Sequence, residues 1–159
     1  MLRTRKLIRI AYTKAGYENL KEKYAKVVTL RPDAVKTLCE ARELGDLSEN
    51  GLYKAARAKL TSLDSSLFRL EMLIKLAEVV HKPNSSIAGI GCKVTVTDGT
   101  NTLNYDLVGK HESDLQNKKI SDESPIGKAL TGKKIGDVVP VNTPNCKINY
   151  KILKIEISR

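Results

Sequence analysis

The 159-residue sequence is long enough for one or two small domains, and its 41% hydrophobic content allows a packed core. With 28 lysines and arginines against 18 aspartates and glutamates, the net charge of +10 favours contact with a polyanion or an acidic protein surface. No stretch approaches the ~20 apolar residues needed to cross a bilayer, and residues 2–10 are too charged for a signal peptide, so we expect a cytoplasmic protein without membrane contact.

The chain opens with a basic extension over residues 1–12, which carries four positive charges and no acidic residue. Thr13 is a suitable N-cap, so we expect a helix to begin directly after it and to end near Leu44. Pro32 lies inside this helix and is expected to kink or restart it. Gly45 is well placed as the C-terminal cap.

Two apolar stripes run outward from Leu47 as mirror images of each other. Their alternating spacings of three and four residues are typical of a helix seam that packs against another helix. The symmetry therefore predicts an antiparallel helical hairpin over residues 13–80, with a return helix over roughly 49–80 and an acidic tip at 45–50. The first stripe is Ala41, Leu38, Ala34, Arg31, Val27, Tyr24, Leu20 and Tyr17, and the second is Tyr53, Ala56, Leu60, Leu63, Leu67, Leu70, Ile74 and Ala77.

After a polar, proline-bearing linker at 81–87, the period changes to the alternation of β-strands over residues 88–159. Residues 92–97 and 103–108 flank an Asp-Gly turn, and residues 138–141 and 148–157 form a second predicted pair. Between the pairs, Ser124 and Pro125 are suited to the N-cap and first position of a short helix. The expected fold class is α+β, with a helical hairpin followed by a small antiparallel sheet and one short helix.

The tip is the strongest candidate for chemistry, because Asp46 and Glu49 stand three residues apart where the hairpin turns. Two carboxylates can share one magnesium ion, which accepts one or two protein carboxylates and retains waters. An exposed pair of this kind makes sense as half of a site that a partner completes, as in two-metal phosphodiester chemistry. The spacing is equally typical of a capping box, with Asp46 as the N-cap and Glu49 reaching back.

The cysteines and histidines do not predict a further site. Cys39, Cys92 and Cys146 are far apart, odd in number and without CxxC spacing, so we expect reduced thiols. His81 and His111 lie outside any ligand spacing, so we expect no metal centre or cofactor of the chain's own.

Residues 41–50, followed by Tyr53, Ala55 and Ala56, resemble the coiled-coil tip of the bacterial GreA/GreB transcript cleavage factors, on the GreA side of that family. Thr13, Gly16, Tyr17 and the Arg31-Pro32 pair resemble that family's first helix. Segments 107–109, 120–121, 124–130, 132–134 and 136–139 resemble its FKBP-like C-terminal domain, so the resemblance covers about residues 13–157.

The resemblance implies a transcription elongation factor and not an enzyme in its own right. It implies that the C-terminal domain docks on RNA polymerase beside the secondary channel, while the coiled coil passes down the channel. Asp46 and Glu49 would then hold a magnesium ion shared with the polymerase active site, and the polymerase would cleave backtracked RNA near its 3′ end. We expect a monomer, with at most weak nucleic-acid contact outside the polymerase.

The resemblance also implies roles for other residues. Gly45, Ser48 and Asn50 would shape the tip. Lys54 and Arg57 would attract the extruded RNA, or would simply form a solvated face of the helix. The polymerase-docking segment would comprise Ser124, Pro125, Ile126, Gly127 and Lys128, although a capped helix that closes a small core explains the apolar members equally well.

Two other functions remain open at this point. Gly51 and Leu52 stand where the family usually has Ala-Glu, which raises the possibility of a secondary-channel regulator that occludes the channel without promoting cleavage. Retention of Asp46 and Glu49 argues against it. A prolyl isomerase would need an aromatic-lined apolar pocket, but residues 84–159 contain no Phe or Trp, and their aromatic residues are Tyr105 and Tyr150.

Overall fold

The structure is a computed structural model that describes residues 9–44, 50–80, 86–142 and 147–158. The chain divides into two compact units. Glu18–Leu76 is called the hairpin unit here, and Met1–Tyr17 with Ala77–Arg159 is called the sheet unit. In the part of the chain that is described, no helix is both long and apolar enough to cross a membrane.

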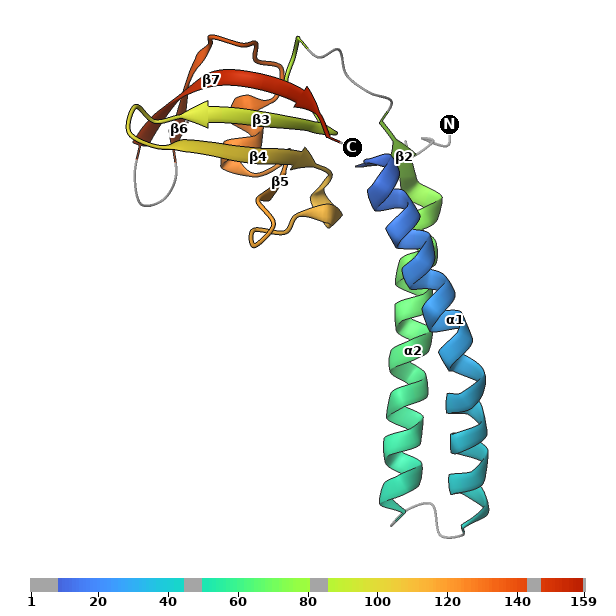
Figure 1. The fold of residues 1–159 in the computed structure, drawn as a ribbon. Helices are drawn as coiled ribbons and strands as arrows, with labels where there is room; N and C mark the ends of the chain where they lie inside the picture. The colour runs from blue at the N-terminus through green and yellow to red at the C-terminus, as the bar shows by residue number, and fades with distance from the viewer. Residues whose placement is uncertain (1–8, 45–49, 81–85, 143–146, 159) are drawn as a thin grey trace, which may run out of the picture. The chain divides into compact units, whose positions relative to one another are not determined.

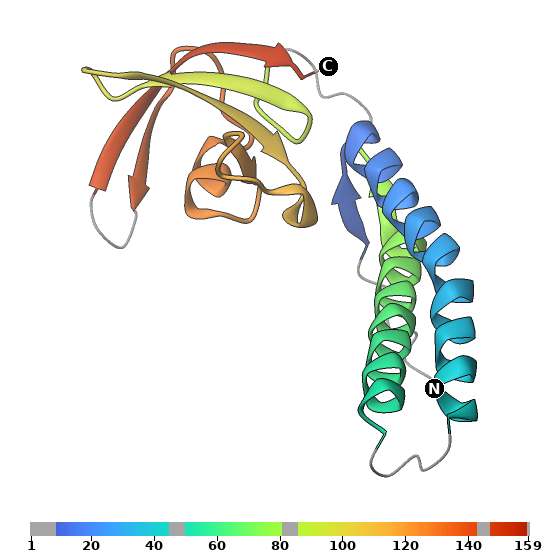
Figure 2. The ribbon, with the colours of Figure 1, turned by 60° about the horizontal axis from the view of Figure 1, so that its bottom comes forward.

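The hairpin unit is built from two antiparallel helices, α1 (Lys14–Glu43) and α2 (Gly51–Leu76), drawn in blue to green in Figures 1 and 2. The buried side chains of α1 and α2 all belong to the two predicted stripes, which confirms the predicted seam. Pro32 lies inside a single continuous α1, so the helix does not restart there. The buried members are Leu20, Ala34 and Ala41 on α1 and Ala56 and Leu70 on α2.

An ion pair across the hairpin shows which residues of the two helices lie opposite each other. The Arg31 Nε atom lies 2.7 Å from Asp64 Oδ1. Asp64 follows Leu63, the residue that the mirror pattern places opposite Arg31. The predicted register therefore agrees with the observed one to within one residue.

The base of α2 differs from the prediction. The helix ends at Leu76 rather than near residue 80, because Ala77–Val79 forms a strand, β2. This strand pairs in parallel with β1 (Ile10–Tyr12), with Ile10 opposite Ala77. Residues expected to belong to a basic extension and to a helix thus form a two-stranded sheet, a pairing that helical periodicity cannot reveal.

The main sheet has the strand order β5-β4-β3-β7-β6. Both predicted antiparallel pairs are confirmed, and β3 also pairs antiparallel with β7. Strand β5 was not predicted from the sequence; it pairs in parallel with β4 after a short 3₁₀ turn, η1 (Lys110–Glu112). The strands are β3 (Cys92–Thr97), β4 (Thr102–Val108), β5 (Lys119–Ser121), β6 (Val138–Asn142) and β7 (Lys147–Ile157).

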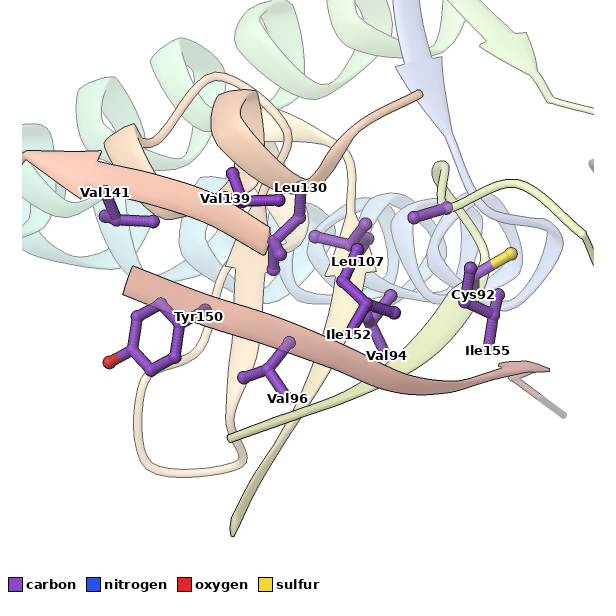
Figure 3. Packing of buried hydrophobic residues seen from close by; sticks show 11 residues of the cluster. Cys92, Val94, Val96, Leu107, Leu130, Val139, Val141, Tyr150, Ile152 and Ile155 are labelled. Carbon is purple, nitrogen blue, oxygen red and sulfur yellow. The ribbon is translucent and has the colours of Figure 1, made fainter. Parts of the chain in front are cut away.

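The core of the sheet unit lies between one face of this sheet and the short helix α3 (Pro125–Leu130). Figure 3 shows Leu130 of α3 among Leu107, Val139 and Ile152 of the strands. Leu107, Leu130 and Ile152 have no exposed surface. The alternation in β3, with Cys92, Val94 and Val96 buried, turns one face of the strand into this core.

Candidate functional site

The predicted tip residues Gly45, Asp46, Ser48 and Glu49 lie outside the described residues. The described chain stops at Leu44, just after the end of α1, and resumes at Asn50, just before α2. In the sequence, the two helices therefore bracket the acidic segment, and the end of α1 and the start of α2 lie at the same end of the hairpin (Figure 2).

Asn50 closes the hairpin with both ends of its side-chain amide. Its Nδ2 atom donates a hydrogen bond to the Ala41 carbonyl oxygen over 2.9 Å, and its Oδ1 accepts one from the Tyr53 backbone N–H over 3.1 Å. Asn50 thus caps the first turn of α2 and holds it against the last turn of α1. Through these two hydrogen bonds Asn50 could shape the tip, as the resemblance implies.

The same geometry bears on one of the two interpretations of the acidic spacing. The capping-box alternative needs Asp46 as the N-cap of the return helix. The N-cap of α2 is Asn50 instead, and the helix begins at Gly51. The cap of α2 therefore requires no carboxylate from the tip.

Beyond the cap, the first half of α2 presents a basic face. Lys54 and Arg57 are exposed, and residues 50–63 contain no acidic residue. Within the described residues neither cation forms an ion pair, whereas Lys75 on the same helix pairs with Glu71. The two cations line a shallow open depression along α2 together with Ala58, Thr61, Ser62 and Ser65. Sequence reasoning found the cations but missed the hydroxyl groups beside them.

The predicted docking segment separates into structural and exposed residues. Ser124 Oγ accepts the Gly127 N–H over 3.0 Å and donates to the Ser121 carbonyl over 2.6 Å, so it caps α3 as expected. A Cβ atom on Gly127 would lie 2.0 Å from the Ser121 carbonyl oxygen, so glycine is required there. Ile126 packs against the core. Pro125 and Lys128 are the two exposed members, whereas Ser124 and Ile126 are only partly exposed.

Lys128 is the exposed cation of α3, whereas the nearby Lys110 is paired with Glu123. Lys110 Nζ lies 2.8 Å from Glu123 Oε2, and this hydrogen bond lowers the pKa of the Glu123 carboxyl. The pair neutralises itself at the surface. Outside the tip, the described residues contain no group of three or more His, Cys, Asp or Glu side chains arranged to hold a metal ion.

Comparison with known proteins adds independent information. Residues 10–79 match the family model described as "Transcription elongation factor, N-terminal", and residues 82–157 match "Transcription elongation factor, GreA/GreB, C-term". The chain is 40% identical over 152 residues to GreA of Thermodesulfovibrio yellowstonii, which covers 92% of this chain and 96% of that protein. GreA of Thermoanaerobacter pseudethanolicus matches with the same identity and coverage.

Among solved structures, the GreA factor homologue Gfh1 of Thermus thermophilus matches with 28% identity and a TM-score of 0.45, over 93% of this chain and 99% of that one. Membership rests on the sequence matches, which span both helices and the whole sheet unit. The chain belongs to the GreA/GreB family of transcription elongation factors.

Proposed function

We propose that this chain binds RNA polymerase, passes its hairpin through the secondary channel, and stimulates cleavage of backtracked nascent RNA. The observation that carries the proposal is the slender hairpin that brackets Asp46 and Glu49. Its seam contains alanines at positions 34, 41 and 56, and small seam residues allow two helices to pack closely. At 1.5 Å per residue, the 30-residue α1 is about 45 Å long, a reach suited to a deep and narrow channel.

Asp46 and Glu49 would supply carboxylate oxygens to a magnesium ion in the polymerase active site. Hard oxygen ligands suit magnesium, and the ion keeps waters when it binds one or two carboxylates. The chemistry that the ion supplies is activation of a water that attacks the RNA phosphodiester. The remaining ligands belong to the polymerase, so this chain acts as a protein factor and not as an enzyme.

Lys54 and Arg57 would draw the displaced RNA 3′ end towards the tip. They lie within the first two turns of α2, and no acidic residue of that half-helix competes for them. Their attraction to phosphates is sequence-independent and is weakened by salt. Pro125 and Lys128 would meet the polymerase surface, because they are the exposed members of the docking segment.

The test is release of short RNA from purified backtracked elongation complexes. Asp46→Asn and Glu49→Gln should each abolish stimulation, while competition with the unlabelled parent protein should show unchanged polymerase binding. Glu43→Gln is the matched control, since Glu43 is an exposed carboxylate at the end of α1 and should keep full activity.

Equal cleavage by the parent and the two tip variants would reject the magnesium-ligand role. If the parent itself binds polymerase but releases no RNA, the alternative function, occlusion of the channel without cleavage, is the correct one. Arg57→Gln should weaken stimulation at moderate salt by reducing RNA capture, and this loss should shrink as salt concentration rises.

A further inference from the structure

The start of α1 contains half of a capping box. Thr13 is the N-cap, and its Oγ1 accepts the Gly16 N–H over 3.0 Å. In a complete capping box, a Glu or Gln at the third helical position reaches back to the backbone N–H of the N-cap. That position is occupied here by Gly16, which has no side chain to do so.

Glu112 of η1 provides the missing half. Its Oε1 accepts the Thr13 backbone N–H over 2.8 Å, and its Oε2 accepts the Thr13 hydroxyl over 2.6 Å. The carboxylate therefore makes the bond to the N-cap N–H that a glutamate at position 16 would otherwise make. All these residues lie within the sheet unit.

Gly16 also creates the space that this carboxylate occupies. A Cβ atom on Gly16 would lie 2.1 Å from Glu112 Cδ and 2.4 Å from each carboxylate oxygen. Any other residue would push the Glu112 side chain aside. The glycine and the glutamate therefore fit together as a matched pair.

Neighbouring contacts seat the strand that leads into α1. A Cβ atom on Gly109 would lie 2.0 Å from the Ala11 carbonyl oxygen, so backbone meets backbone closely at this point. Tyr12 is 2% exposed, and its ring stacks on His111 with ring centroids 6.3 Å apart. These contacts join β1 to η1 and to the residue before it, next to the Thr13–Glu112 hydrogen bonds.

The carboxyl of Glu112 is partly buried. Burial raises the pKa of the Glu112 carboxyl, against the opposing effects of the Thr13 hydrogen bonds and of Lys119. Burial and the proximity of Glu112 also raise the pKa of the Tyr12 hydroxyl. A glutamine at position 112 keeps one carbonyl oxygen, so it should still accept the Thr13 N–H.

We propose that Glu112 completes the capping box of α1 in trans and is thereby a positioning residue, which ties the first turn of the hairpin helix to the 3₁₀ turn of the C-terminal sheet. This role goes beyond the proposed function and needs no polymerase. A glutamate at position 16 would itself accept the Thr13 N–H. The helix would then keep its cap but lose its hydrogen bonds to Glu112.

The first test is amide hydrogen exchange of the full-length protein, read at residues 13–17. Glu112→Ala should speed exchange there about tenfold, which corresponds to about 1.4 kcal/mol, while the β3 and β7 amides keep their protection. Glu112→Gln should restore most of the protection. Gly16→Glu should keep residues 13–17 protected through its own internal cap.

The second test asks whether the Thr13–Glu112 hydrogen bonds hold the start of α1 in place within the sheet unit. Spin labels are placed at Lys14→Cys, in the first turn of α1, and at Lys133→Cys, both exposed positions of the sheet unit, in a Cys39→Ser and Cys146→Ser background. Cys92 is fully buried and burial raises the pKa of its thiol, so it should not react. The distance distribution should be at least twofold broader in Glu112→Ala and in Gly16→Glu than in the parent, and parent-like in Glu112→Gln.

The pair of tests separates a tie from a simple helix cap. Gly16→Glu should combine a protected helix start with a broad distance distribution. A parent-like distribution in Gly16→Glu, or unchanged exchange in Glu112→Ala, would overturn the proposal. Should Glu112→Ala fail to fold, Gly16→Glu still decides the question, because it displaces the Glu112 side chain without changing any residue of η1.

Discussion

The hairpin unit and the sheet unit are stabilised by different amounts of apolar burial. In its two described helices, the hairpin buries five side chains along a single seam, and three of them are alanines. The sheet unit buries a continuous cluster of eleven residues that includes Leu107, Leu130 and Ile152 without exposed surface. Since stabilisation scales with buried apolar area, the sheet unit should supply most of the stability. The small seam residues allow the two hairpin helices to pack closely, but they bury less apolar surface than larger residues would.

The largest expected effect lies in the sheet core. Ile152→Ala should lower the free energy of unfolding by about 2–5 kcal/mol, because it removes a fully buried side chain and leaves a cavity. Leu63→Ala in the half-buried hairpin seam should cost only about 1 kcal/mol. Urea denaturation of both variants measures the difference. Equal losses would contradict the unequal division of stability between the units.

The narrow seam can be tested by filling it. Ala34 is 1% exposed, so Ala34→Leu should force the helices apart and cost about 1–3 kcal/mol. The helical circular dichroism signal should therefore be lost at a lower temperature than in the parent protein. Ala55→Leu places the same bulk on an exposed position of α2 and should change little. If both variants melt alike, close packing of α1 on α2 is not what limits the seam.

The closed end of the hairpin depends on a cap and not on burial. Asn50→Ala removes the acceptor for the Tyr53 N–H and the donor to the Ala41 carbonyl, and should destabilise the first turn of α2 by about 1 kcal/mol. Amide exchange at Tyr53 and Lys54 measures the effect. Asn50→Asp keeps the acceptor and should retain most of the protection; protection that survives in Asn50→Ala would show that the cap is dispensable.

The smallest effect concerns the turn between β3 and β4. Asp98 Oδ1 accepts hydrogen bonds from the N–H groups of Thr100 and Asn101 and from the Thr100 hydroxyl, and these bonds lower the pKa of Asp98 to about 2. Because the folded pKa is depressed, the contribution of Asp98 is present above its ordinary value of 3.8 and is lost as pH falls through about 2.

Carboxyl chemical shifts followed through an acid titration should give that midpoint for Asp98. The variant Asp98→Asn should lose the pH dependence of the turn amides while leaving the hairpin unit unaffected. A midpoint near 3.8 would show that the turn does not hold the carboxylate as described.

Much of the fold could be predicted because the relevant signals are local. The seam follows from spacings of three and four, the two strand pairs follow from alternation around turns, and the cap of α3 follows from Ser124 before Pro125. At the candidate site, the basic pair Lys54 and Arg57 was recognised from the sequence. The sequence offered Asp46 as one possible N-cap of the return helix and did not single out Asn50, because Asn, Asp and Ser are all good caps and several stand close together in this segment.

The sequence by itself determined the antiparallel hairpin and its register, because a periodic stripe on each helix can be buried in essentially one way. Tertiary structure alone decided the pairing of β1 with β2, the parallel addition of β5 and the hold of Glu112 on Thr13. These contacts, all within the sheet unit, depend on two hydrogen bonds to one carboxylate or on three-residue strands. Such short contacts leave no period in the sequence, since their geometry exists only once the sheet unit has folded.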